Sequence, residues 1–371
     1  MEKSHLDPWP DFRFTPEEIA GAVGDYGTLL PIVLGVAIVS HVNIGYILLF
    51  FSVWYIITGV YYRMPVPVEP MKAVGAIVIA EGLSKNEIAA SGMILGVLFL
   101  GLGLSKRMKF IQEKVPYSVI RGIQLGLALL LLKTSLNFII KDYLLAIMCI
   151  LIVIVFFTAK KMRRIPDVSA LIVLLTGIFI GLYVHGIPPI TVIQLPKIII
   201  PAFQDLSRAA WSLALPQAPL TMTNAILATT LLMQDLLHRD VDPDTLSLTI
   251  GLMNVTSVPF GGFPMCHGAG GLAAQYRFGA RTGGSNIISG LILLPIALFF
   301  ASPDFVALIP FGVFGALLIF VAVELGSHSL KTDSYIVTGA VGILALVGGI
   351  SIAFIGGMIL AWLSSKIIRS Q

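Results

Sequence analysis

Glu69 and Lys72 are the residues whose types and spacing first suggest chemistry. They lie three positions apart in PVPVEPMKAVGA, residues 65–76, where three prolines precede a short apolar stretch. A helix that starts here would leave free N–H groups and the Lys72 ammonium at one end, which together favour an anion. The simpler alternative is that Glu69 and Lys72 only pair with each other. The first interpretation makes Lys72 a direct ligand, with Glu69 as its partner when the site is empty.

A second segment of the same kind lies in the other half of the chain. FPMCHGAGG, residues 263–271, places a proline before a glycine-rich helix start, where the backbone is open to close approach. Two adjacent residues, Cys266 and His267, are too few for a metal site, so we expect polar contacts there and no metal or cofactor. The predicted substrate contacts from both segments are Glu69, Met71, Lys72, Ala73, Cys266, His267, Gly268 and Ala269.

Two further stretches combine helix-breaking residues with polar side chains. GAVGDYGTLLP (21–31) holds Asp25 between glycines, and LPQAPLTMTNA (215–225) holds two prolines. Asp25 could carry a coupling proton, bind a cation, or accept a hydrogen bond from a freed backbone amide; Glu69 is the other proton candidate. Thr28, Gln217 and Asn224 could either bind an oxyanion or pack between helices. The predicted helix breaks are at Gly24, Gly27, Pro70, Pro216, Pro219 and Pro264.

Composition indicates the elements that must position these residues. The chain has 371 residues, 57% hydrophobic and 12% charged, with a mean hydropathy of +0.93. Soluble domains carry about 25% charged residues, so most of this surface must face lipid. The basic residues sit in short loops, which argues against nucleic-acid binding. The sequence contains no Walker motif and no nucleophile–base set, so neither an ATP-driven pump nor an enzyme is expected.

The hydrophobic pattern predicts an all-α polytopic membrane protein with fourteen spans, of which the third and tenth are half-length. Lysines and arginines concentrate in the loops on the side of the termini, and the other side has few. This bias predicts that both termini are cytoplasmic. The expected spans are 17–39, 43–62, 69–82, 87–104, 117–132, 142–159, 167–184, 215–237, 243–258, 266–277, 284–301, 307–325, 333–348 and 350–367.

The two halves of the chain match at one gap-free offset. Pro70 aligns with Pro264, and Gly96 aligns with Gly290. Seven spans in each half require the second half to be inverted, an arrangement typical of secondary transporters with mid-membrane sites between interrupted helices. The expected organisation is a cytoplasmic tail (1–16), a first repeat (17–184), an extracytoplasmic connection (185–214) and a second repeat (215–371).

These motifs resemble the molybdate transporter family, a branch of the SulP sulfate and anion permeases. The resemblance rests on PVPVEPMKAVGA, GAVGDYGTLLPIVLG and FPMCHGAGGLAAQYRFGARTGG, and runs over nearly the whole chain. It implies a core domain of spans 1–4 and 8–11, a gate domain of spans 5–7 and 12–14, and an elevator-like motion of the core. It also implies a site between spans 3 and 10 at Glu69, Pro70, Met71, Lys72, Cys266, His267, Gly268 and Gly270. No STAS domain is expected.

The expected function is import of a tetrahedral oxyanion across the plasma membrane. The expected coupling is symport with protons. Molybdate is the first expectation, with sulfate second and tungstate as a further substrate. A homodimer in the lipid bilayer is a further expectation. An anion channel and a nucleobase permease are the alternatives. A channel would need a continuous polar pore, and a nucleobase pocket should hold carboxylates rather than Lys72 between helix N-termini.

Overall fold

The computed structural model describes residues 12–108, 115–163, 168–300, 305 and 307–369. Most of the expected tail lies outside these residues. The structure is helical, and a helix coincides with each expected span. Its principal helices are α1 (Pro16–Ala22), α2 (Tyr26–Ser40), α3 (Ile44–Tyr62), α4 (Lys72–Glu81), α5 (Lys85–Ser105), α7 (Tyr117–Ile139), α8 (Tyr143–Arg163), α9 (Ser169–His185), α10 (Phe203–Ala209), α11 (Leu215–Leu220), α12 (Ala228–Leu237), α13 (Pro243–Ser257), α14 (Ala269–Phe278), α15 (Gly284–Pro295), α17 (Phe311–Ser329), α18 (Tyr335–Gly348) and α19 (Ile350–Arg369).

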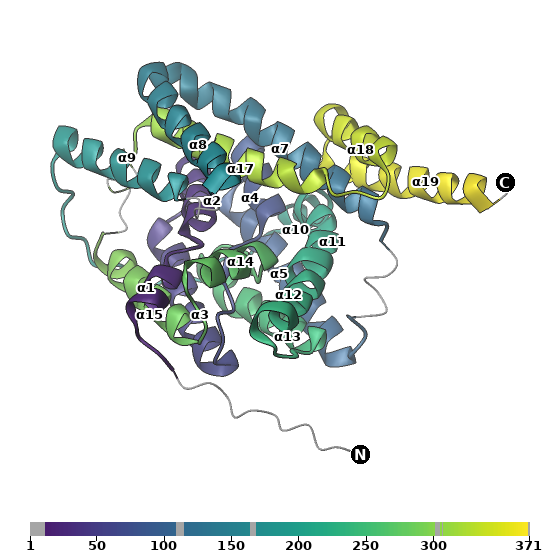
Figure 1. Ribbon diagram of the computed structural model, residues 1–371, viewed down its shortest axis with the longest axis horizontal. Coiled ribbons are helices and arrows are strands. Elements are labelled where there is room, and N and C mark those ends of the chain that lie inside the picture. The colour runs from purple at the N-terminus through teal and green to yellow at the C-terminus, as the bar shows by residue number, and fades with distance from the viewer. Residues whose placement is uncertain (1–11, 109–114, 164–167, 301–304, 306, 370–371) are drawn as a thin grey trace, which may run out of the picture.

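The helices form two groups. Helices α7, α8, α9, α17, α18 and α19 lie together along one side, and the remaining helices lie on the other side (Figure 1). Within the first group α17 and α18 pack on α7, and within the second α13 packs on α5 and α15 packs on α3. The groups meet where α2 contacts α9 and α17, and where α4 contacts α7. We call the two groups the six-helix side and the half-helix side.

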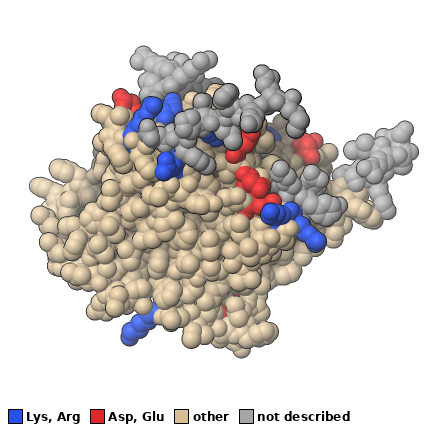
Figure 2. Space-filling model, turned by 90° about the horizontal axis from the view of Figure 1, so that it is seen from below, with Lys and Arg blue, Asp and Glu red and all other residues tan. Residues whose placement is uncertain are grey.

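The surface is that of a membrane protein. Five helical stretches among the described residues are long and apolar enough to cross a bilayer: 16–40, 44–62, 85–105, 117–156 and 311–329. Many large apolar side chains, such as Leu104, Phe179 and Ile343, are exposed. Charged side chains gather toward one side of the face seen in Figure 2, and most of the rest of that face is uncharged. Such a surface is stable only against lipid.

The two proline-containing segments meet as a pair of short strands. Strand β1 (Glu69–Pro70) pairs antiparallel with β2 (Met265–Cys266), with Glu69 opposite Cys266. Half-helix α4 starts two residues after β1, and α14 starts three residues after β2. Each half-helix ends at a glycine with positive φ, Gly82 at 67° and Gly279 at 119°. The pairing of β1 with β2 therefore brings the starts of the two half-helices close together.

Extended backbone inside the protein needs hydrogen-bond partners, and asparagine side chains supply them. Asn254 of α13 accepts from the Met265 N–H at 3.0 Å and donates to the Met265 carbonyl at 2.7 Å, which fastens β2. Asn286 of α15 donates to the Val66 carbonyl ahead of β1. The extended approaches are thus held by neighbouring helices.

The first span is broken at Gly24, as the sequence predicts, whereas Gly27 lies inside α2 and the eighth span is not broken. Residues 23–25 form a turn between α1 and α2, with Asp25 at the start of α2. In contrast, one continuous helix runs from Phe203 to Leu237 and contains two π-helical segments, Ala210–Ala214 and Thr221–Leu227. Pro216 follows the first π-helical segment and Pro219 precedes the second, so each missing N–H lies beside a wide turn. The prolines therefore widen this helix without breaking it, and it starts earlier than the expected residue 215.

Candidate functional site

A cavity of about 80 Å³ lies at the meeting point of the half-helices. A water-sized group needs roughly 10–15 Å³ of such space, so the cavity holds a handful of atoms and suits a small ion. Its wall combines β1, β2 and the starts of both half-helices with α7, α11 and α17. It is lined by Glu69, Lys72, Gln124, Gln217, Leu220, Thr221, Asn224, Ala225, Cys266, His267, Gly268, Ala269, Gly270, Leu325 and His328.

Lys72 supplies the positive charge of the cavity and is held between two carboxylates. Its Nζ lies 3.2 Å from Glu69 Oε2 and 3.6 Å from Glu324 Oε1. Glu69 is buried, whereas the Lys72 and Glu324 side chains remain partly exposed. The simple pairing of Glu69 with Lys72 is therefore present, and Glu324 is an additional partner.

The N-terminus of α4 is already occupied by a side chain. Gln217 Oε1 accepts hydrogen bonds from the N–H groups of Ala73 at 2.9 Å and Val74 at 3.3 Å, and its Nε2 donates to Thr221 Oγ1 at 2.9 Å. Gln217 thus acts as a capping group supplied by another helix. The free N-terminus that we expected at α4 is filled, and Ala73 contributes its N–H to this cap rather than to the cavity.

The first turn of α14 is open by comparison. Gly268, Ala269 and Gly270 line the cavity, and their N–H groups lie in the first turn, where no intrahelical acceptor is available. A Cβ at Gly270 would be 3.6 Å from Lys72 Nζ. An anion placed over this turn would meet both the helix N-terminus and the Lys72 ammonium.

A second pair of carboxylates lies behind Lys72. A Cβ at Gly271 would overlap Glu69 Oε1 and come within 2.8 Å of Asp25 Oδ2, so the two carboxylates are neighbours. Both of these oxygens are buried and have no hydrogen-bond partner among the described residues. A single proton between them would satisfy both, because a protonated carboxyl donates one hydrogen bond. Asp25 does not line the cavity itself.

Several other predicted contacts have mainly supporting positions. His267 lines the cavity, but its Nδ1 donates to the Pro67 carbonyl at 2.9 Å and its Nε2 contacts Thr249 Oγ1 at 2.8 Å, so both ring nitrogens are engaged elsewhere. Met71 is fully buried and does not line the cavity. Thr28 donates to Glu324 Oε2 at 3.0 Å. Cys266 and Asn224 line the cavity.

Sequence reasoning missed the contribution of α7 and α17. Glu324 of α17 contacts Lys72, and Arg121 of α7 is buried with its Nη1 2.7 Å from Gln124 Oε1. Gln124 and His328 then line the cavity. The sequence signal that could have identified these helices is a charged residue inside an apolar span, because such a residue usually marks a functional position.

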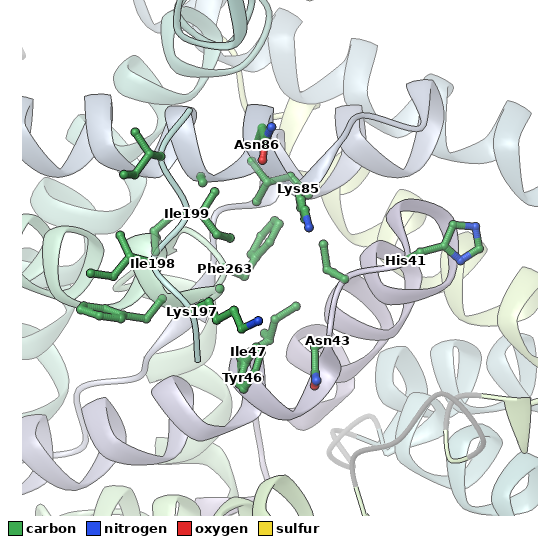
Figure 3. Close-up of a pocket in the computed structure, with 18 of the residues that line it drawn as sticks. His41, Asn43, Tyr46, Ile47, Lys85, Asn86, Lys197, Ile198, Ile199 and Phe263 are labelled. Carbon is green, nitrogen blue, oxygen red and sulfur yellow. The ribbon is translucent and has the colours of Figure 1, made fainter. Parts of the chain in front are cut away.

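A larger cavity of about 540 Å³ lies away from the half-helix starts. Lys85 and Lys197 point toward its centre from different segments, and Ile47, Ile199 and Phe263 supply apolar wall (Figure 3). Both lysines are exposed, and none of the lining residues is a carboxylate. The smaller cavity, with its buried charges and open helix turn, is the better candidate for a selective ion site.

Comparison with solved structures defines the class of protein. The fold matches the transmembrane domain of a cyanobacterium bicarbonate transporter, BicA, with a TM-score of 0.66 at 20% identity over 94% of this chain and 98% of that one. It also matches the murine anion transporter Slc26a9 in its inward-facing state, with a TM-score of 0.72 at 14% identity over 99% of this chain and 70% of that one. The protein is thus a helical membrane protein with the fold of these transporters.

The family follows from sequence. A family model described as "Molybdate transporter of MFS superfamily" matches residues 17–131 and 209–325. Molybdate transporter 2 of Arabidopsis thaliana is 32% identical over 86% of this chain and 81% of its own length, and molybdate transporter 1 of the same plant is 30% identical over 94% and 88%. Molybdate transporter 1 of Chlamydomonas reinhardtii is 25% identical over 90% and 88%. The chain belongs to the molybdate transporter family, a family of transporters and not of enzymes.

Proposed function

We propose that the protein is a secondary active transporter that imports a tetrahedral oxyanion, with molybdate as the first substrate and sulfate and tungstate as competitors. The observation that carries this proposal is the placement of Lys72 beside the open first turn of α14, within a cavity of ionic size. The names of the relatives favour molybdate among the oxyanions. Molybdate and sulfate share charge and shape, so geometry alone does not separate them.

In this proposal the anion lies between Lys72 and the N–H groups of Gly268–Gly270. Gln124, Asn224 and Thr221 line the same cavity and offer side-chain N–H or O–H groups to the remaining oxygens. Gln217 Oε1 caps the N-terminus of α4. Its Nε2 carries two N–H groups, of which one is donated to Thr221 and the other is available to the substrate. A dianion requires such a set, because each oxygen that loses water must regain a donor.

Proton coupling follows from the excess of carboxylates. Lys72 already contacts Glu69 and Glu324, and Asp25 lies next to Glu69. A dianion that enters beside ionised carboxylates is repelled, so we propose that protons bind with it. The unpartnered oxygens of Asp25 and Glu69 are the proposed proton site, in keeping with the sequence expectation for these two residues.

The proposed architecture consists of two inverted seven-span repeats. The half-helix side corresponds to the core of spans 1–4 and 8–11, and the six-helix side to the gate of spans 5–7 and 12–14. Transport would be an elevator-like movement of the core against the gate, with both termini cytoplasmic, in the plasma membrane. A homodimer is a further proposal. The pairing of β1 with β2 and the two separate helix groups are what support this arrangement.

The alternative functions are a sulfate permease, an anion channel and a nucleobase permease. A channel is less favoured because the cavity is small and bounded by the starts of two half-helices. The carboxylates around Lys72 are a feature that a nucleobase pocket would share, so the competitor series must include uracil.

Uptake of labelled molybdate into proteoliposomes tests the proposal. We expect competition by tungstate and sulfate, none by uracil, and faster uptake when the outside is more acidic than the lumen. Inhibition by uracil without inhibition by tungstate would overturn oxyanion transport. Uptake that ignores the proton gradient would remove the coupling, and flux that does not saturate would favour a channel.

A further inference from the structure

The Glu324 carboxylate joins the two helix groups at the cavity. Its Oε1 lies 3.6 Å from Lys72 Nζ of α4, and its Oε2 accepts a hydrogen bond from Thr28 Oγ1 of α2 at 3.0 Å. Both partners belong to the half-helix side, whereas Glu324 belongs to α17 on the six-helix side (Figure 1). One carboxylate therefore uses both oxygens to tie the two groups together, and it is the one acidic residue of α17.

We infer that Glu324 occupies part of the substrate's place in the empty protein, and that the transported oxyanion displaces it from Lys72. The inference rests on the proposed function and adds a regulatory contact to the same site. It assigns to Glu324 a specific role as an internal competitor, which holds the two helix groups together until an anion arrives.

The donors around Glu324 are those that an oxyanion would use. A carboxylate presents two oxygens to an ammonium and a hydroxyl, as one edge of a tetrahedral oxyanion would. The open first turn of α14 is within reach of the same groups, because a Cβ at Gly270 would be 3.6 Å from Lys72 Nζ and 3.7 Å from Glu324 Oε1. An anion over Gly270 would thus contact Lys72 and crowd Glu324.

Like charges at this distance repel, so the anion and the Glu324 carboxylate compete for Lys72. Glu69 is less easily displaced, because it is buried on the same side as Lys72 and packs against Gly268 and Gly271. Glu324 is partly exposed and comes from the opposite side. When it leaves, the Lys72 and Thr28 contacts across the boundary are both lost. Substrate binding would then free the half-helix side to move, and an empty protein would stay tied.

Binding of tungstate to purified Glu324→Gln protein tests the competition. The amide has nearly the same shape and can still accept from Thr28, but its charge is gone. We expect affinity for tungstate to rise about tenfold, as removal of one nearby like charge in a partly exposed site predicts. Glu324→Asp keeps the charge and should stay close to the wild type. Glu17→Gln, which removes an exposed carboxylate of α1, is the matched control. Unchanged or weaker binding by a folded Glu324→Gln protein would overturn the competition.

A disulfide reporter tests the tie without any substrate. A Cβ at Gly27 of α2 would be 3.3 Å from the Ala170 Cβ of α9, close to disulfide spacing across the same boundary. In a protein with Cys149 replaced by serine and the buried cavity residue Cys266 retained, we expect the Gly27→Cys, Ala170→Cys pair to cross-link quickly. Tungstate should slow the reaction several-fold, and Glu324→Gln should slow it without tungstate.

The two measurements separate this inference from the proposed function. Equal cross-linking rates with and without the Glu324 charge would overturn the tie, even if oxyanions bind and are transported. Slower cross-linking by Glu324→Gln in a protein that binds no oxyanion would uphold the tie and overturn both oxyanion transport and the competition.

Discussion

The carboxylate of Glu69 lies against the backbone of Gly271, in the space that a side chain at residue 271 would need. The same space borders Asp25 Oδ2, at 2.8 Å from the Cβ position. Three segments that are distant in sequence (the α1–α2 break, β1 and α14) therefore meet at one glycine. Gly24 of the break also packs on α14, since its Cβ would be 3.2 Å from the Ala274 carbonyl oxygen.

Gly271→Ala is expected to disable transport while the protein still inserts and folds. The methyl group would push Glu69 and Asp25 apart and disturb the Lys72 pair. Gly270→Ala is the matched control, because its Cβ would meet nothing closer than 3.6 Å. We expect at least a tenfold loss of molybdate uptake for Gly271→Ala. For Gly270→Ala we expect a normal fold, with any loss confined to anion affinity. Equal uptake by wild type and Gly271→Ala would contradict the assigned packing.

Lys72→Gln should abolish oxyanion binding. The change removes the positive charge and leaves Glu69 and Glu324 without their shared partner. We expect affinity to fall by about a hundredfold or more, since removing one member of a desolvated charge pair costs about 2–5 kcal/mol. Lys72→Arg should retain weak binding, because it keeps the charge but changes the geometry. Direct tungstate binding measures the effect; unchanged affinity would leave Lys72 as a structural partner only.

Gln217 is expected to support α4 rather than to select the anion. Gln217→Leu removes the acceptor for the Ala73 and Val74 N–H groups, and unsatisfied buried donors cost about 1–3 kcal/mol. We expect a lower melting temperature together with weaker binding. Gln217→Glu keeps an acceptor at the α4 N-terminus, so it should fold better than Gln217→Leu, yet its charge should repel the anion. A Gln217→Leu protein with wild-type stability would argue against the cap.

Asn254 is expected to matter for stability because it fastens β2 on both sides of Met265. Asn254→Leu leaves the Met265 N–H and carbonyl without this partner inside the protein. A loss of about 2–4 kcal/mol follows from two unsatisfied backbone groups. The control is Thr158→Val on α8, an exposed residue whose hydroxyl bonds carbonyl groups of its own helix at 2.8 and 2.9 Å. Thermal unfolding in detergent compares them, and equal melting temperatures would contradict the role of Asn254.

Sequence patterns predicted the positions of the helices well, because long apolar runs and prolines act locally. They identified the two half-helices and the break at Asp25, which depend on glycine and proline within a few residues. They did not predict the continuous helix from Phe203 to Leu237. A proline can end a helix or be absorbed in a wider turn, and neighbouring packing decides which of the two happens.

The sequence by itself determined that this is a helical membrane protein and that residues 69–72 and 264–271 interrupt its helical pattern, and it predicted Lys72 as the central residue of the site. Only the tertiary structure decided that Gln217 fills the start of α4, that His267 is engaged by backbone and hydroxyl groups, and that Glu324 reaches Lys72 from another helix group. The physical reason is that a side chain's partners across a boundary depend on how helices pack. Spacing along one helix identifies neighbours within about a turn and carries no information on that packing.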